Sequence, residues 1–238
     1  MWIIIVLCFT YTSLTESSLA PFITKCKWND SKCMKESAAK AVPILAPGIP
    51  DLKVETMDPM KIKHVDSSNA NLKLIVTDIE VTELKKCEAK KVTRDLEKKK
   101  LIFKVACPAN VEAQYDMNGQ LFVLPIRGKG GLHVQIKKIV INIEVDLDEF
   151  DDKDGKKHWK VKSYKHVFDF KEPSDVKFDN LFPDNEFLRK NTNELIAKNG
   201  NDVIKEIGAP IIKAIVEIAV KNVENFFAAV PLEELVLD

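Results

Sequence analysis

Hydrophobic and polar residues alternate with a period of two from about residue 62 to residue 182. This period is typical of β-strands that bury one face and leave the other in water. Turn-forming residues interrupt it at 118–119 (Asn-Gly), 128–131 (Gly-Lys-Gly-Gly) and 154–155 (Asp-Gly). Because such residues tolerate tight reversals of the chain, the segment predicts a series of consecutive antiparallel strands.

The alternation changes phase within the first of these strands. Leu72, Leu74 and Val76 share one face, whereas Ile79 and Val81 have the opposite phase. One inserted residue, a β-bulge, brings both groups to the same face and bends the strand. The sequence therefore predicts a curved sheet.

Beyond residue 193 the period changes to that of an α-helix. The apolar stripe consists of Ile204, Ile207, Ile211, Ile212, Ile215, Val216, Ile218, Ala219, Val223, Phe226 and Phe227. The pattern resumes in phase after Pro210, so we expect a kink there and one helix of roughly 35 residues, about 50 Å long. Only the inner face of the curved sheet is long enough to cover it, which predicts an α+β fold with the sheet wrapped around the helix.

A short helix is also predicted near the N-terminus. Asn29 or Asp30 can cap it, its apolar positions run to Ala41, and the prolines that begin with Pro43 should end it. Residues 29–31 (Asn-Asp-Ser) also form a glycosylation sequon, so Asn29 either caps this helix or carries a glycan. Both interpretations place Asn29 on the surface.

The first twenty residues have the character of a secretory signal peptide. Residues 2–9 are apolar and residues 11–20 are small and polar, a run too short to span a bilayer permanently. We expect cleavage between Thr15 and Ala20 and a single mature domain over 21–238. The mature protein is then soluble, exported and not inserted in a membrane.

Four cysteines remain after removal of this segment. Pairing is the default in an oxidising compartment, and Cys26 and Cys33 enclose a short loop that a disulfide would close. Cys87 and Cys107 flank a charged turn at 94–100 almost symmetrically, which places them across a hairpin if both arms are strands. The second pair is therefore either a disulfide or two buried free thiols.

Charge and motifs exclude several functions. Thirty-six basic and 36 acidic residues give a formal net charge of zero, so nucleic acid is not an expected partner. The sequence lacks the G-x-S-x-G, H-E-x-x-H and P-loop motifs. The acidic stretch at 146–154 fails as a calcium loop because Phe150 and Val161 occupy ligand positions. We expect no enzyme, cofactor or metal site, although a hydrolase of an unfamiliar type remains an alternative.

Residues 115–130 (YDMNGQLFVLPIRGKG) resemble the Y…G…L-P-I-x-G-x-G signature of the insect haemolymph juvenile-hormone-binding and takeout proteins. The resemblance covers essentially the whole mature chain. Further matching features are the cysteine pair 26 and 33, Gly-Ile-Pro at 48–50, Asp-Pro at 58–59, Phe-Asp-Asn-Leu-Phe at 178–182, Asn-Phe-Phe at 225–227 and Pro-Leu-Glu-Glu-Leu at 231–235. The last two look most like the takeout branch.

This resemblance implies an elongated protein whose curved sheet and long helix enclose a tunnel for a lipophilic ligand. It implies a monomeric haemolymph carrier of juvenile hormone, another isoprenoid or a fatty-acyl lipid, which leaves its ligand chemically unchanged. The expected ligand-binding residues are Leu101, Phe103, Val105, Val123, Val134, Ile136, Ile141, Ile143, Phe168, Ile207, Ile211, Ile215 and Phe226. Candidates for contact with a polar head group are Tyr115, Tyr164, His133 and Thr77. A secreted signalling module with a filled core is the alternative, because an inward apolar face suits a solid core equally well.

Overall fold

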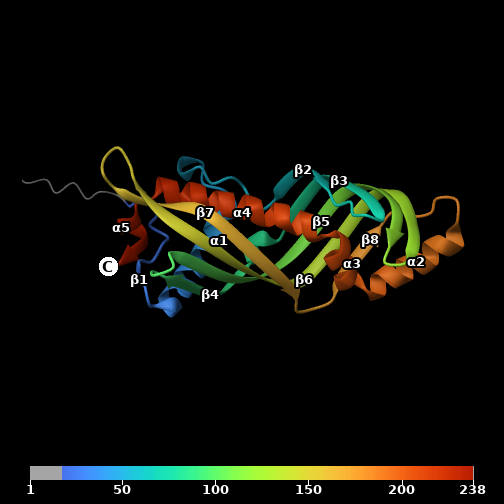
Figure 1. Ribbon diagram of the computed structural model, residues 1–238, viewed down its shortest axis with the longest axis horizontal. Coiled ribbons are helices and arrows are strands. Elements are labelled where there is room, and N and C mark those ends of the chain that lie inside the picture. Colours follow the sequence, from blue (N-terminus) through green and yellow to red (C-terminus); the bar gives the residue numbers. More distant parts are fainter. Residues whose placement is uncertain (1–17, 238) are drawn as a thin grey trace, which may run out of the picture.

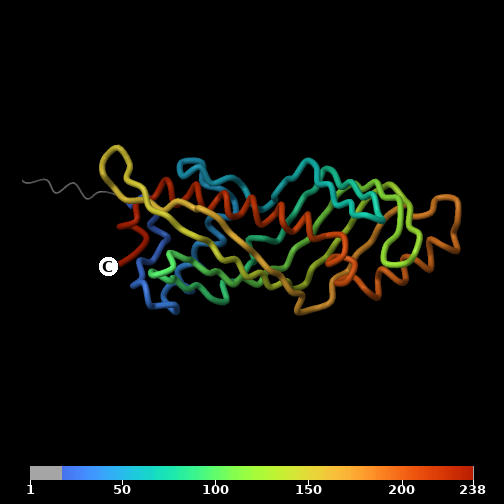
Figure 2. The backbone as a smooth tube through the Cα atoms, in the orientation of Figure 1, coloured from blue at the N-terminus to red at the C-terminus, as the bar shows by residue number. Residues whose placement is uncertain are grey.

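The computed structural model describes residues 18–237. The molecule is elongated, and one long helix runs along a strongly curved antiparallel sheet (Figure 1). The backbone trace shows the described N-terminal segment and the C-terminal end close together at one end of the long axis (Figure 2). The expected α+β fold with a curved sheet and a C-terminal helix is confirmed.

The sheet has the strand order β2-β3-β5-β6-β7, and two further strands pair with its two longest members. The strands are β2 (Met60–Asp66), β3 (Leu72–Thr82), β4 (Glu88–Asp95), β5 (Lys100–Leu121), β6 (Leu124–Asp151), β7 (Lys157–Phe170) and β8 (Ser174–Phe178). Strand β4 pairs with β5 and β8 pairs with β6, and all these pairs are antiparallel. At about 3.3 Å per residue β6 follows a path of about 90 Å, so a strand of this length has to coil along the molecule.

The predicted bulge lies in β3. The register with β5 shifts between Thr77 and Glu80, and Asp78 has a φ of 52°. A short polar side chain tolerates this left-handed conformation better than a β-branched one. The bulge brings Val76 and Ile79 to the same buried face, as the phase change indicates.

Two of the three predicted turns are wrong. Residues 118–119 lie inside β5 and 128–131 lie inside β6, whereas the hairpin reverses at 122–123. Gly119 is needed for close packing, because a Cβ on it would lie 2.3 Å from the backbone oxygen of Asn71. The turn at 154–155 is confirmed, with Gly155 at a φ of 76°. The charged turn expected at 94–100 spans only 96–99.

The helices are α1 (Ser31–Leu45), α2 (Glu186–Lys198), α3 (Gly200–Ile207), α4 (Ala209–Ala229) and α5 (Leu232–Leu235), with short 3-10 turns η1 (Pro50–Leu52) and η2 (Leu84–Lys86). Asp30, not Asn29, caps α1 by accepting a hydrogen bond from the Cys33 N–H at 2.9 Å. Contrary to expectation, Pro43 lies within α1, which continues to Leu45.

The C-terminal helix is present as α4, but the prediction that it runs without a break for roughly 35 residues is wrong. The helical region breaks at Asn199 and at Gly208, and Pro210 lies in the first turn of α4 rather than at a kink. Proline loses no helical hydrogen bond in that turn, so it favours a new start over a bend. Helix α4 contacts both β7 and β2, the two edges of the main sheet path, and therefore covers the open side of the curved sheet (Figure 1).

The two ends of the described chain meet beside α5. Strand β1 (Cys26–Lys27) pairs in parallel with β9 (Val236–Leu237). Before β1, Ala20 is buried, and Leu19 donates its backbone N–H to Glu234 at 2.8 Å. Residues 1–17 of the expected signal peptide lie outside the described residues.

Candidate functional site

Two apolar cavities lie between the inner face of the sheet and the C-terminal helices. The larger has a volume of about 330 Å³ and the smaller about 90 Å³. Four residues line both of them: Leu84, Cys107, Ile141 and Ile215. The cavities therefore adjoin each other, which gives the expected tunnel the form of two neighbouring chambers.

Strict alternation on two neighbouring strands builds the sheet side of the larger cavity. Every second residue of β5 from Leu101 to Cys107 borders it. Their register partners on β6 are Val145, Ile143, Ile141 and Ile139, and paired residues of antiparallel strands project to the same face. All eight line one or both cavities, so the period of two places a continuous apolar surface on the inner face.

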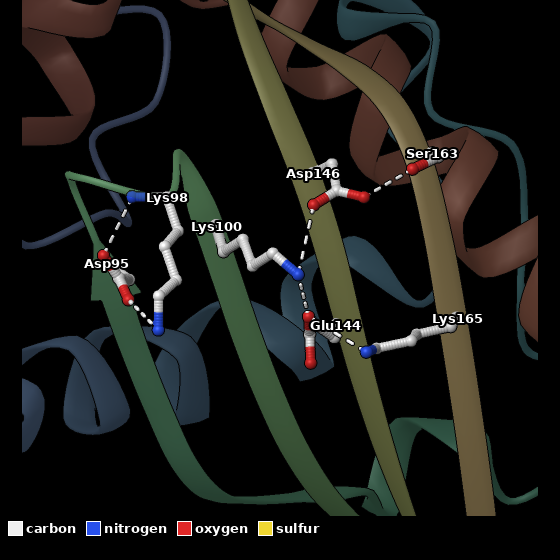
Figure 3. A network of polar contacts seen from close by, with 7 residues as sticks. All are labelled: Asp95, Lys98, Lys100, Glu144, Asp146, Ser163 and Lys165. Carbon is white, nitrogen blue, oxygen red and sulfur yellow. Dashed lines mark hydrogen bonds and ion pairs between the residues drawn. The ribbon is translucent and has the colours of Figure 1, made fainter.

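The opposite face of the same strands is polar (Figure 3). Lys100 donates a hydrogen bond to Glu144, whose carboxylate also lies 3.3 Å from the Lys165 ammonium. The Ser163 hydroxyl donates to Asp146 at 2.5 Å. Because the hydrogen bond from Lys100 favours the charged carboxylate, it lowers the pKa of Glu144. The acidic stretch of β6 thus takes part in ion pairs across the outer face.

Eleven of the thirteen residues expected to contact a ligand border a cavity: Leu101, Phe103, Val105, Val134, Ile136, Ile141, Ile143, Ile207, Ile211, Ile215 and Phe226. Val123 does not, and its side chain is 84% exposed at the β5–β6 turn. The error follows from the misplaced turn, which shifts the register at the end of β5. Phe168 packs against the hydrophobic core beside Phe170 and borders neither cavity.

The sequence did not identify several parts of the lining. Helix α1 contributes Met34, Ala38 and Ala41, which are spaced at i, i+4 and i+7, and this helical stripe was the signal available. Trp159 of β7 and Leu235 at the end of α5 also border the larger cavity. Their contribution depends on contacts between segments that are distant in the chain.

The four residues expected to contact a polar head group border neither cavity. Tyr115 is buried and donates its hydroxyl hydrogen to the backbone oxygen of Asp179 at 2.5 Å, and burial raises its pKa. His133 lies between the carboxylates of Asp179 and Glu112, which raise its pKa because they favour the charged imidazolium. Tyr164 and Thr77 are also outside both linings.

Arg94 is the one charged residue that lines either cavity within the part of the chain described by the structure. Its guanidinium carbon lies 4.6 Å from the centre of the Trp159 ring, within the range of a cation–π interaction. Nη2 of Arg94 lies 4.0 Å from Oε1 of Glu149. Between residues 18 and 237, no group of three or more His, Cys, Asp or Glu side chains is arranged to hold a metal ion.

Two disulfides fix the walls of the larger cavity. Cys26–Cys33 connects β1 with α1, and Cys87–Cys107 connects the residue before β4 with β5. Three of these cysteines line the larger cavity: Cys26, Cys87 and Cys107. The second pair, left open from the sequence, is therefore bonded.

The profile of the haemolymph juvenile hormone binding protein family matches residues 3–237. The chain belongs to this family. Its members are binding proteins by name. The family assignment confirms the resemblance carried by residues 115–130.

Similar proteins support this assignment. The chain resembles the circadian clock-controlled protein daywake of Drosophila yakuba, with 26% identity over 182 residues that cover 71% of this chain and 70% of daywake. It is 27% identical to the Drosophila melanogaster daywake over 187 residues, with the same shares of both chains. The crystal structure of Epiphyas postvittana takeout 1 superposes with a TM-score of 0.87 at 29% identity, covering 91% of this chain and 100% of that chain.

The family signature has a packing role in this member. A Cβ on Gly128 would lie 2.5 Å from the Tyr115 hydroxyl oxygen, and one on Gly130 would lie 3.0 Å from the Asp179 backbone oxygen. The glycines therefore let the segment after β8 pack directly on β6, where Tyr115 bonds to it. This explains why the signature combines a tyrosine with glycines in a strand.

Among residues 18–237, none of the helices has the length and apolar character that a membrane span requires.

Proposed function

We propose that this protein is a secreted, monomeric carrier that holds one small lipophilic ligand in the two adjoining cavities and leaves it chemically unchanged. The observation that carries the proposal is the larger cavity of about 330 Å³ with an almost wholly apolar lining. Its volume is within the range of small-molecule sites, about 300–1,000 Å³. The family match supports ligand binding, and the two disulfides support an extracellular location.

The driving force is the transfer of apolar ligand surface out of water. Burying about 400 Å² of an isoprenoid or fatty-acyl chain at about 25 cal/mol per Å² contributes about 10 kcal/mol before the entropic losses of association. Affinities between micromolar and nanomolar are then expected. The lining offers no constellation for acid–base or nucleophilic chemistry among the described residues, since Arg94 is the only charged residue bordering either cavity.

Native mass spectrometry of the secreted protein tests this function. We expect a co-purified lipid of defined mass that organic solvent extracts, and uptake of a fluorescent fatty-acyl probe by the delipidated protein. Size-exclusion chromatography with light scattering measures the expected monomer mass. Absence of both lipid and probe uptake would instead support the signalling module with a filled core.

A further inference from the structure

The larger cavity comes closest to open solvent at one place. Of the residues between 18 and 237 that line it, only Thr24 and Trp28 are exposed, and the others are buried or half-buried. Trp28 is 47% exposed, although tryptophan is on average among the well-buried residues. Both residues lie beside β1, so the mouth of the cavity is at that end of the long axis (Figure 1).

The local fold holds Trp28 at the tip of a turn. The Asp30 N–H donates to the Lys27 backbone oxygen at 3.0 Å, which places Trp28 in the centre of a β-turn. The Cys26–Cys33 disulfide closes the base of this loop, with a Cα–Cα distance of 5.7 Å. Because the loop already fixes the exposed ring, little conformational entropy is lost when a partner covers it.

Basic residues surround this turn. Between residues 25 and 35 the chain carries four lysines and one aspartate, a formal charge of +3 in a protein whose total is zero. The lysines are Lys25, Lys27, Lys32 and Lys35, and all four are exposed. No ion pair within the described part of the chain involves them, and the aspartate, Asp30, caps α1. A cluster of this kind is complementary to an anionic surface.

Acidic residues at the same end of the molecule already have partners. Asp151 of the β6–β7 hairpin lies 3.7 Å from Lys157, and Glu233 of α5 lies 3.7 Å from Lys156. Glu234 accepts the hydrogen bond from the Leu19 N–H. The β6–β7 hairpin also lies on the opposite side of the molecule from the turn at 27–30 (Figure 2). The positive charge around Trp28 is therefore largely unopposed.

We propose that the end of the molecule around Trp28 docks reversibly on a bilayer that contains anionic phospholipids. The lysines contact the head groups, and the Trp28 ring enters the interfacial layer, which suits an apolar ring with one polar N–H. A basic cluster and an apolar anchor act together in peripheral membrane binding. Docking places the cavity mouth against the bilayer, so a ligand passes between them without crossing water. Only this last step rests on the proposed carrier function.

Asn29 sets a condition on the proposal. It follows Trp28 in the turn, and Asp30 rather than Asn29 caps α1, so the sequon at 29–31 is free to carry a glycan. A glycan there is bulky and solubilising and keeps this end away from a bilayer. The intact mass of the protein secreted from insect cells should therefore be that of an unglycosylated chain. A glycan that Asn29→Gln removes would overturn the proposal.

Co-sedimentation of the delipidated secreted protein with vesicles tests docking directly. Vesicles of phosphatidylcholine are compared with vesicles that also contain about 30% phosphatidylserine. We expect at least about ten-fold tighter binding to the anionic vesicles, since each lysine near such a surface contributes about five-fold, and weaker binding at high salt. In Trp159→Phe, Trp28 is the only tryptophan of residues 18–237, and its emission should shift to shorter wavelength on docking.

Variants separate the two parts of the docking surface. Lys27→Gln combined with Lys32→Gln should weaken binding to anionic vesicles by about 10- to 30-fold. Trp28→Ala should weaken it by about ten-fold and leave its salt dependence unchanged. Lys190→Gln combined with Lys198→Gln is the matched charge control, because both lysines are exposed on α2 at the opposite end of the long axis (Figure 1). This control should bind like the wild type.

The outcomes distinguish docking from ligand binding. Equal affinity for the two kinds of vesicle, or wild-type binding by the Lys27 and Lys32 double variant, would overturn the proposal. A dimer in light scattering that Trp28→Ala dissociates would also overturn it, because a second copy of the chain then covers the mouth. Failure of the wild type to take up a fluorescent fatty-acyl probe would contradict the carrier function instead, and vesicle binding is measured independently of it.

Discussion

Ala219 offers a direct test of the cavity, because it borders the larger chamber from α4, between Ile215 and Val223 on the same helix face. Replacing it with leucine adds three carbon atoms to the empty space. At about 0.8 kcal/mol per buried methylene the ligand-free protein should gain about 2 kcal/mol. The gain is small compared with the total penalty of an empty volume of about 330 Å³, which is about 8 kcal/mol at about 24 cal/mol per Å³.

The assay is differential scanning fluorimetry of the delipidated protein combined with fatty-acyl probe binding. A gain of about 2 kcal/mol raises Tm by about 4–8 °C for a chain of this size. Probe affinity should fall, because leucine occupies part of the ligand volume. Ala228→Leu is the matched control, since Ala228 is exposed on the same helix and borders neither cavity. A lower Tm for Ala219→Leu together with unchanged probe binding would refute an open chamber at this position.

Three further variants test other parts of the structure. Gly200→Ala should lower the free energy of unfolding by about 1–3 kcal/mol, because a Cβ there would lie 1.9 Å from the Ser174 backbone oxygen. A urea unfolding curve of the variant that matches that of the wild type would contradict this packing. His133→Gln should destabilise more at pH 6 than at pH 9, because Asp179 raises the pKa of His133 and its stabilisation is present below the unfolded pKa of about 6.5 and lost as pH rises through the folded value; equal losses at both pH values would contradict it. Cys87→Ser should cost about 3 kcal/mol for a separation of 20 residues, and reduction of the wild type should reproduce much of that loss in urea denaturation.

The sequence predicted the sheet well where alternation is uninterrupted. The apolar residues of β5 from Leu101 to Cys107 face inward as expected, because the period of two leaves a single orientation that buries them. The turns predicted at 119 and at 128–131 are wrong because they were inferred from glycine. A glycine required for close packing and one required for a turn are identical in sequence, and the packing partner lies far along the chain.

The helical region shows a similar ambiguity. The apolar stripe continues in phase through Gly208 and Pro210, so it does not reveal that two helices share one face. Only the backbone geometry shows the break at Gly208. Pro210 fits the start of a helix as well as the interior of a kinked one, and the preceding glycine favours the start.

The cavity between the sheet and the helix is the feature that is hardest to predict from the sequence. Apolar residues that face inward are required for a packed core and for a cavity alike. The difference depends on small side chains at the cavity wall, such as Ala38 of α1, Ala89 of β4 and Ala219 of α4, all of which border the larger cavity. Arg94 was assigned to a turn because it begins a charged run, and only the register with Leu101 places it inside.

The pairing of β1 with β9 constrains the order in which the molecule can be assembled. Leu235 and Val236 belong to the wall of the larger chamber, yet they are synthesised about two hundred residues after the cysteines of the first disulfide. This wall can therefore form only after the ribosome has synthesised the chain as far as Val236. Under the proposed carrier function, ligand loading then follows synthesis of this wall, and it depends on the supply of ligand in the compartment where the protein folds.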